Sequence, residues 1–269
     1  MTAPQTGEPV LTGVRNFRDL GGLPAGDGRR VRPGRLFRSG HLAAATASDR
    51  AFLASLGLRT VFDFRNAADQ ALDGPDVALP GVRNVGVPLS DPADGAQFWA
   101  MVRDGGVAEL REALNGGRAA GRMVTSYRHM VQYRTVELGR VLRALADGGT
   151  PALLHCAAGK DRAGLTVALT LLAVGVERDA IVADYLKSNA PHRRYPVRRG
   201  SGAPPLTEAL AAEVGQLLAP LFDARAEYLA AAFDEIDAAW GGPAAYFGDA
   251  LGLTAADLAG LRRALLTDG

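Results

Sequence analysis

Apolar positions along the chain follow two different periods. Short runs typical of strands occur at residues 35–38, 60–64, 82–87 and 152–155, and the run at 60–64 is rich in β-branched and aromatic residues. We expect the runs at 60–64 and 82–87 to be buried strands. Strands that alternate with helical segments and precede a helical C-terminal third predict an α/β fold, in which helices wrap a central sheet.

The predicted helices carry apolar residues every three or four positions. Thr46 or Ser48 caps the first of them and Thr254 caps the last. The segments are 46–56, 98–147 with breaks at 105–106 and 116–117, a helix that starts at 163, and 179–188, 206–218, 225–240, 244–251 and 255–266.

Composition narrows the function classes. The chain has 269 residues, of which 48% are apolar, enough for one large domain or two small ones. The formal net charge of +1 gives no electrostatic reason to bind nucleic acid or an anionic membrane. The single cysteine excludes an internal disulfide. The apolar run at 163–176 is too short to cross a bilayer, so we expect no transmembrane segment.

The first ten residues lack the basic and apolar regions of a classical signal peptide. We therefore expect a cytoplasmic protein, or one that is exported without such a signal.

The stretch His-Cys-Ala-Ala-Gly-Lys-Asp-Arg-Ala-Gly, residues 155–164, holds the only cysteine and one of the two lysines of the chain. The strand at 152–155 runs into this loop, and the loop runs into a predicted helix. Backbone N–H groups in such a loop converge on one point, and the helix N-terminus adds partial positive charge. The sequence therefore predicts an anion cradle, in which the Arg162 guanidinium holds two oxygens of a phosphate.

Cys156 lies at the end of the strand, beside this cradle. Helix N-termini and cationic neighbours favour the ionised form of a thiol, so we predict a thiolate that faces the bound phosphorus. This arrangement suits covalent phosphoryl transfer. A cysteine after a strand is, taken alone, more often a packing residue. The combination of strand, His155-Cys156, Arg162 and apolar helix favours the catalytic interpretation.

The stretch resembles the His-Cys-x5-Arg signature of cysteine-dependent phosphatases. Its Lys-Asp pair before the arginine resembles a bacterial branch of tyrosine and dual-specificity phosphatases with phosphotyrosine and phosphoinositide activity. Further segments follow the order of that branch, at 16–22, 35–40, 63–65, 184–189 and 227–230. The resemblance implies a tyrosine-phosphatase-like fold with a mostly parallel sheet, as a single domain at 16–269 after an N-terminal tail at 1–15.

The resemblance also implies residue roles. Cys156 becomes a phosphocysteine, Arg162 binds the phosphate, and Asp161 orients the loop or shares in proton transfer. Lys160 contacts the phosphate or a neighbouring anionic group. The backbone that binds phosphate is that of Ala157, Ala158, Gly159, Lys160, Asp161 and Arg162. No metal and no cofactor is implied.

The general acid of that branch lies in a Leu-Pro-x-x-Asp loop after a strand. The matching segment here, Val-Pro-Leu-Ser-Asp at 87–91, assigns the acid to Asp91, with Asp94 as a rival. An alkoxide or phenoxide leaving group needs such a proton. One position departs from the branch, which has Thr directly after the arginine where this chain has Ala163. Without that hydroxyl near the sulfur, we expect slower breakdown of the phosphocysteine.

Three further features each keep two interpretations. The arginine-rich loop at 192–205 either holds a polyanionic substrate or is a solvated surface loop. Residues 98–131 form either a helical lid over the pocket, as in the resembling branch, or ordinary helices packed on the sheet. Asp63 and Arg65 either brace the site beside His155 or pair with each other.

These observations predict a metal-independent phosphomonoester hydrolase. We expect a phosphorylated substrate, either a phosphotyrosine protein or a phosphoinositide-like ester. A phosphatase for a small metabolite, such as a sugar or nucleoside phosphate, is the alternative, because the loop recognises only the phosphate. A phosphate-binding module without turnover is a third possibility, which only Ala163 supports.

Overall fold

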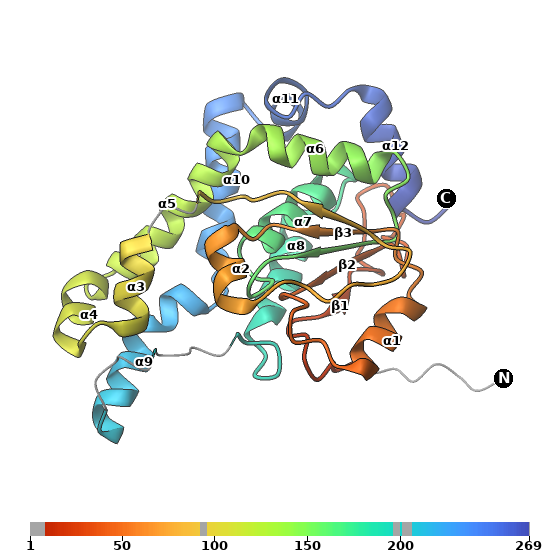
Figure 1. Ribbon diagram of the computed structural model, residues 1–269. Helices are drawn as coiled ribbons and strands as arrows, with labels where there is room; N and C mark the ends of the chain where they lie inside the picture. Colours follow the sequence, from red (N-terminus) through yellow and green to blue (C-terminus); the bar gives the residue numbers. More distant parts are fainter. Residues whose placement is uncertain (1–8, 92–95, 196–199, 201–205, 269) are drawn as a thin grey trace.

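The computed structural model describes residues 9–91, 96–195, 200 and 206–268. Its five-stranded sheet has the order β1-β2-β5-β3-β4 (Figure 1). The strands are β1 Arg18–Asp19, β2 Leu36–Ser39, β3 Thr60–Asp63, β4 Arg83–Gly86 and β5 Ala152–His155. β1 pairs antiparallel with β2, and the other pairings are parallel. The predicted α/β fold with a mostly parallel sheet is therefore confirmed.

Alternate residues of the central strands point to opposite faces of the sheet, as the pleat requires. Leu153 of β5 and Phe37 of β2 pack with Leu53 of α1 on one face. Leu154 and Leu36 pack on the other face, with the large apolar cluster that the remaining helices supply. Both faces are thus covered, as expected for parallel strands.

The helices agree closely with the apolar periodicity. They are α1 Ala47–Ser55, α2 Ala67–Asp73, α3 Ala96–Asp104, α4 Val107–Leu114, α5 Arg118–Tyr133, α6 Thr135–Ala146, α7 Arg162–Ala173, α8 Arg178–Leu186, α9 Glu208–Phe222, α10 Ala226–Trp240, α11 Pro243–Ala245 and α12 Ala255–Leu265, with short η1 Lys187–Asn189 and the π turn η2 Tyr246–Ala250. The predicted caps are present, because Thr46 accepts from the Asp49 N–H and Thr254 from the Asp257 N–H.

Three predictions about elements need correction. The strand at 82–87 is the shorter β4, and it lies mainly exposed because it pairs with β3 alone among the described strands. The helix expected at 244–251 is divided into α11 and the π turn η2. α9 extends to Phe222 and includes Pro220, beyond the predicted end at 218. β1 and α2 were not predicted.

The parallel strands β2, β5 and β3 end at one edge of the sheet, because Ser39, His155 and Asp63 are in register. In open parallel sheets, ligands bind beyond this carboxyl edge. Of the helices in the described part of the chain, none combines the length and the hydropathy needed to cross a membrane.

Candidate active site

The predicted cradle is the connection between β5 and α7 at the carboxyl edge of the sheet. Cys156 directly follows β5 and is 2% exposed. Arg162 is the first residue of α7, so the loop ends at a helix N-terminus whose partial positive charge attracts anions. The structure therefore places Cys156 and Arg162 at the two ends of one short loop, as the sequence predicted.

Gly159 gives this loop its shape. Its φ of +67° lies in the left-handed region, which glycine adopts without the steric cost of a Cβ. A Cβ at this position would also lie 2.2 Å from the Ser39 carbonyl oxygen. The loop thus packs directly on the end of β2, and no larger residue fits there.

Two buried side chains hold the carbonyl groups of the loop. The Asn16 Nδ2 donates to the Ala158 and Gly159 carbonyls, at 3.2 and 3.0 Å. The Arg38 Nη2 donates to the carbonyls of Gly159 and Lys160, at 2.7 and 3.2 Å. Because C=O and N–H groups of a peptide point in opposite directions, these bonds turn the N–H groups away from Asn16 and Arg38. This is the orientation that an anion cradle needs.

A buried carboxylate, that of Asp184, supports Arg38 directly and Asn16 through Arg18. Asp184 of α8 bonds Arg18 through Nε at 2.9 Å and lies 3.3 Å from the Arg38 Nη1. Burial raises the pKa of Asp184, but the charges of Arg18 and Arg38 outweigh it and lower the pKa overall. Burial and the charge of Arg18 lower the pKa of Arg38 to about 10. Arg18 also donates to the Asn16 side chain at 2.6 Å, which completes the support.

Sequence reasoning missed this support. The residues of this support lie in segments that resemble the phosphatase branch, but no role followed from the segments alone. They are Asn16, Arg18, Arg38, Asp184 and Ser188. A signal was present in the arginines and the aspartate, because charged residues are rarely buried unless they are paired. Their pairing, across more than 140 residues, could not be read from the pattern.

The Arg162 guanidinium is anchored through one nitrogen. Its Nη1 donates to the Asp69 carboxylate, to Ser90 Oγ at 3.3 Å and to the Phe64 carbonyl at 3.4 Å. Burial lowers the pKa of Arg162, but the electrostatic effects of Cys156, in its ionised form, and of the Asp69 carboxylate outweigh burial and raise the pKa. The guanidinium therefore stays charged. Asp69 belongs to α2, the helix that was not predicted.

Lys160 is held at the end of α9, and its predicted contact with a phosphate or a neighbouring anionic group stays a prediction. Its Nζ donates to the carbonyls of Leu221 and Asp223, at 2.8 and 3.0 Å, and lies 3.3 Å from Asp161 Oδ1. These carbonyls belong to the end of α9, where C=O groups lack partners within the helix. The contacts tie the loop to α9, and they give no support to the prediction that Lys160 contacts phosphate.

Asp161 is held by Tyr127, whose hydroxyl also pairs with that of Tyr185. Tyr127 of α5 donates its hydroxyl to Asp161 Oδ1 at 2.9 Å and lies 2.8 Å from the Tyr185 hydroxyl. Burial, followed by the negative charge of Asp161, raises the pKa of Tyr127 well above its usual value. The Tyr127 hydroxyl is therefore a permanent donor, and one oxygen of Asp161 is occupied by it.

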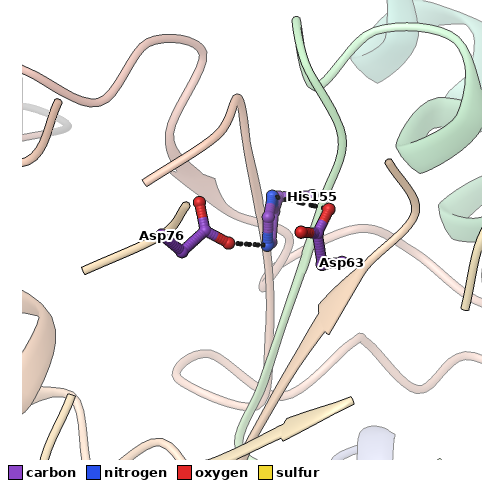
Figure 2. A group of neighbouring side chains, drawn as sticks. All are labelled: Asp63, Asp76 and His155. Carbon is purple, nitrogen blue, oxygen red and sulfur yellow. Dashed lines mark ion pairs between the residues drawn. The ribbon is translucent and has the colours of Figure 1, made fainter. Parts of the chain in front are cut away.

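Asp63 and Arg65 pair with each other and also lie beside His155. Figure 2 shows the His155 ring between two carboxylates, with Nε2 2.9 Å from Asp76 Oδ2 and Nδ1 3.8 Å from Asp63 Oδ1. The Arg65 Nη2 lies 2.9 Å from both Asp63 and Asp76. The predicted pairing of Asp63 with Arg65 is therefore present, and their role in bracing the site stays a prediction. Asp76 is an additional member that the sequence did not suggest.

The ligand atoms of Asp63, Asp76 and His155 lie within 4.8 Å of one another, a spacing that could suit a metal ion. Two observations argue against a metal. The two imidazole nitrogens face different carboxylates, whereas one ion would need one nitrogen. The Arg65 guanidinium already binds both carboxylates. These contacts favour an ion-pair cluster over a metal site.

The remaining candidates lie around the loop. Asp91 is exposed and follows Ser90, whereas its rival Asp94 lies outside the described residues. Of the arginine-rich loop, the described part shows Arg194 3.0 Å from Asp223 and the Tyr195 hydroxyl 2.5 Å from Asp73. Residues 196–199 and 201–205 lie outside the described residues. A substrate role for this loop stays a prediction.

The predicted lid comprises α3, α4 and most of α5. Figure 1 shows α3, α4 and α9 together to one side of the sheet. Trp99 of α3 contacts the Phe222 ring of α9, and Arg122 of α5 lies 3.8 Å above the Phe98 ring. These helices thus pack on one another and on α9. The end of α9 in turn accepts hydrogen bonds from Lys160 of the loop. Closure over the pocket stays a prediction.

The chain is similar to several known proteins. A sequence model of the tyrosine phosphatase family matches residues 9–267. The chain is 36% identical over 249 residues to a Cupriavidus necator protein named as a tyrosine-protein phosphatase, which covers 92% of this chain and 85% of the relative. It is 38% identical over 277 residues to the triple specificity protein phosphatase PtpB of Mycobacterium tuberculosis, over 95% of this chain and 98% of the relative. A crystal structure of TpbA from P. aeruginosa aligns with 76% of this chain and 90% of that chain, at 18% identity and a TM-score of 0.30.

Proposed function

Because this chain belongs to the tyrosine phosphatase family, we propose that it hydrolyses phosphotyrosine proteins and phosphoinositide-like esters through a phosphocysteine on Cys156. The chain is a cysteine-based phosphatase. The observation that carries the proposed mechanism is the loop itself. Asn16 and Arg38 hold its carbonyls, Arg162 stands at the N-terminus of α7, and Cys156 lies at the other end.

The first step forms a bond between sulfur and phosphorus. The Cys156 thiolate attacks the phosphorus in line with the leaving oxygen, and the P–O bond to that oxygen breaks. The loop N–H groups and the Arg162 guanidinium stabilise the charge on the equatorial oxygens. The leaving oxygen takes a proton from the general acid. In the second step, water attacks the phosphorus and gives a proton to the carboxylate of the general acid, the S–P bond breaks, and inorganic phosphate and the thiolate are released.

Asp91 is the proposed acid. It follows Ser90, whose hydroxyl lies 3.3 Å from Arg162 Nη1, so its loop reaches the phosphate-binding arginine. Asp161 is the less suitable acid, since its Oδ1 accepts from Tyr127 and lies beside the Lys160 ammonium. We assign Asp161 to loop orientation and Asp91 to proton transfer.

The proposed substrate range is broad. The mycobacterial relative carries the name of a triple specificity protein phosphatase, which supports action on more than one kind of phosphomonoester. The loop binds only the phosphate group of a substrate, so segments around the loop must bind the rest of the substrate. Ala163 is fully buried and has no hydroxyl to offer the sulfur. The nearby Thr166 hydroxyl already donates to the Arg162 carbonyl. Slow breakdown of the phosphocysteine therefore stays a prediction.

Release of phosphate from an activated aryl ester tests the proposal. We expect turnover by the wild type with EDTA present, competitive inhibition by vanadate, and loss of more than about 99% of turnover in Cys156→Ser, because a serine hydroxyl is not ionised at neutral pH. Activity that EDTA removes and a metal restores would overturn the mechanism. A panel of phosphotyrosine peptide, phosphoinositide, sugar phosphate and nucleotide, ranked by kcat/KM, decides the substrate class.

A further inference from the structure

Asp69 lies against the phosphate-binding arginine, and the chemistry described so far gives it no role. It is the third residue of α2, where its Oδ2 accepts from the Asn66 N–H at 3.0 Å and from Arg162 Nη1. The same nitrogen reaches Ser90 Oγ and the Phe64 carbonyl. Three acceptors from three separate segments therefore converge on Nη1 of one side chain.

This convergence determines which edge of the guanidinium is available. Within the described part of the chain, the hydrogen bonds of the Arg162 side chain all start from Nη1. A bidentate bond to phosphate needs two N–H groups that point the same way. The edge formed by Nε and Nη2 supplies such a pair, and it remains available when Nη1 is anchored.

We infer that Asp69 is a positioning residue for phosphate binding, which fixes Nη1 of Arg162 so that the Nε–Nη2 edge faces the bound phosphate. The inference rests on the proposed function of the loop. Asp69 touches neither substrate nor thiolate in this arrangement and acts through Arg162. An arginine has several rotatable bonds, so holding one nitrogen removes conformational freedom that phosphate binding would otherwise have to remove.

The carboxylate is itself held in place. Asp69 and Asn66 form a capping box, in which each side chain accepts from the backbone N–H of the other. Asn66 Nδ2 also donates to Ser90 Oγ at 3.1 Å. The N-terminus of α2 therefore links Arg162 to the segment that ends in Asp91, and it keeps the phosphate-binding arginine and the proposed acid in register.

An opposite effect of Asp69 has to be weighed, because its negative charge also repels a phosphate. The geometry favours positioning, since Asp69 binds Nη1 and leaves the two-nitrogen edge to the ligand. A competitor would occupy that edge. The two effects have opposite signs in an experiment: removal of a positioning residue weakens phosphate binding, and removal of a competitor strengthens it.

Asp69→Asn tests the inference, with Asp257→Asn as a matched control. Asp257 is the third residue of α12 and closes the same kind of capping box with Thr254, but it is half-buried and, within the described part of the chain, has no hydrogen bond or ion pair with the loop. For Asp69→Asn we expect the KM of an aryl phosphate and the inhibition constant of inorganic phosphate to rise about tenfold, from loss of a charge-assisted bond. The factor is the same for good and poor leaving groups. Asp257→Asn leaves both constants unchanged.

The increase in Tm that inorganic phosphate produces is a second readout, which needs no turnover. We expect this increase in wild type and Asp257→Asn and a smaller one in Asp69→Asn. Unchanged or tighter phosphate binding in Asp69→Asn overturns the inference. If Asp69→Asn does not fold, Asp69→Glu is the deciding variant. Its longer side chain displaces the carboxylate, which should weaken inhibition by phosphate. An unchanged inhibition constant in Asp69→Glu would then overturn the inference. Wild type that neither binds phosphate nor hydrolyses the ester refutes the proposed function instead.

Discussion

Gly159 shows at the residue scale how the cradle depends on backbone geometry. Gly159→Ala should destabilise the protein by at least ~1–3 kcal/mol, because the residue combines a positive φ with a Cβ position 2.2 Å from the Ser39 carbonyl oxygen. We also expect loss of most aryl phosphatase activity, since the loop must shift. Urea unfolding and kcat/KM measure the two effects.

Gly28→Ala is the control for this prediction. Gly28 also has a positive φ, of 83°, but a Cβ there would meet no atom within 4 Å. It isolates the conformational cost from the close contact with β2. If Gly159→Ala were no worse than Gly28→Ala, packing on Ser39 would not shape the loop.

Asp91 and Asp161 differ in a way that kinetics can separate. If Asp91 protonates the leaving group, Asp91→Asn costs little on a nitrophenyl ester, whose leaving group departs almost unaided. On phosphotyrosine or alkyl phosphates it should cost about 100- to 10,000-fold, the usual contribution of general acid catalysis.

Asp161→Asn is the comparison. It weakens the contact with Tyr127 and should reduce kcat/KM by a similar factor on every substrate, since the loop is disturbed in each case. A dependence on the leaving group in Asp161→Asn, and none in Asp91→Asn, would place the proton within the loop.

At the scale of elements, Lys160 connects the loop to the end of α9. Lys160→Met keeps the apolar stem and leaves the Leu221 and Asp223 carbonyls without this donor, at a cost of about 1–3 kcal/mol of stability. We expect equal losses of kcat/KM on an aryl phosphate and on a phosphoinositide. Lys187→Met is the control, because Lys187, the other lysine, is largely exposed. A loss of kcat/KM confined to substrates with a second anionic group would instead support the predicted contact of Lys160 with the substrate.

α2 was not predicted from the sequence, and this omission matters most because α2 carries Asp69, which binds Arg162. Three of its seven residues are alanine, Leu72 is its one large apolar side chain, and none of the seven is buried, so the helical period is weak. A signal did exist in the spacing of Asn66 and Asp69, which form a capping box at the helix start. Read as a helix N-terminus, that spacing predicts α2, but it does not predict contact with Arg162.

At the scale of the whole molecule, Asp184 joins α8 to the two N-terminal strands β1 and β2. Asp184→Asn leaves Arg18 and Arg38 buried without their carboxylate, which should cost about 3–5 kcal/mol. Its pKa is lowered in the folded state, so its stabilisation is complete above the ordinary value of 3.8 and is lost as the pH falls through the lower folded value. The stability difference between wild type and variant should therefore be constant near neutrality and shrink below about pH 3.8.

Urea unfolding from pH 7 to pH 3 measures this difference. Asp237→Asn is the matched control, since Asp237 pairs with Arg178 at the surface and should contribute only about 0–1 kcal/mol. Equal effects of the two variants would mean that burial of the Asp184 cluster adds nothing to stability.

The sequence by itself determined the local features of this protein. The spacing of apolar residues located most helices and strands, because that spacing reflects which side of each element is buried. The order of strand, His155-Cys156, loop and Arg162 predicted an anion cradle at a helix N-terminus, since the chemistry lies within eight consecutive residues.

Only the tertiary structure decided the partners of these residues. The Asp69 that anchors Arg162 lies 93 positions away, and the Arg18 that pairs with Asp184 lies 166 positions away. Lys160 turned toward α9 for the same reason: a long side chain bonds whichever acceptors the packing places within reach, and here these are the last carbonyls of a distant helix. Periodicity encodes burial, whereas the pairing of buried charges depends on the path of the whole chain.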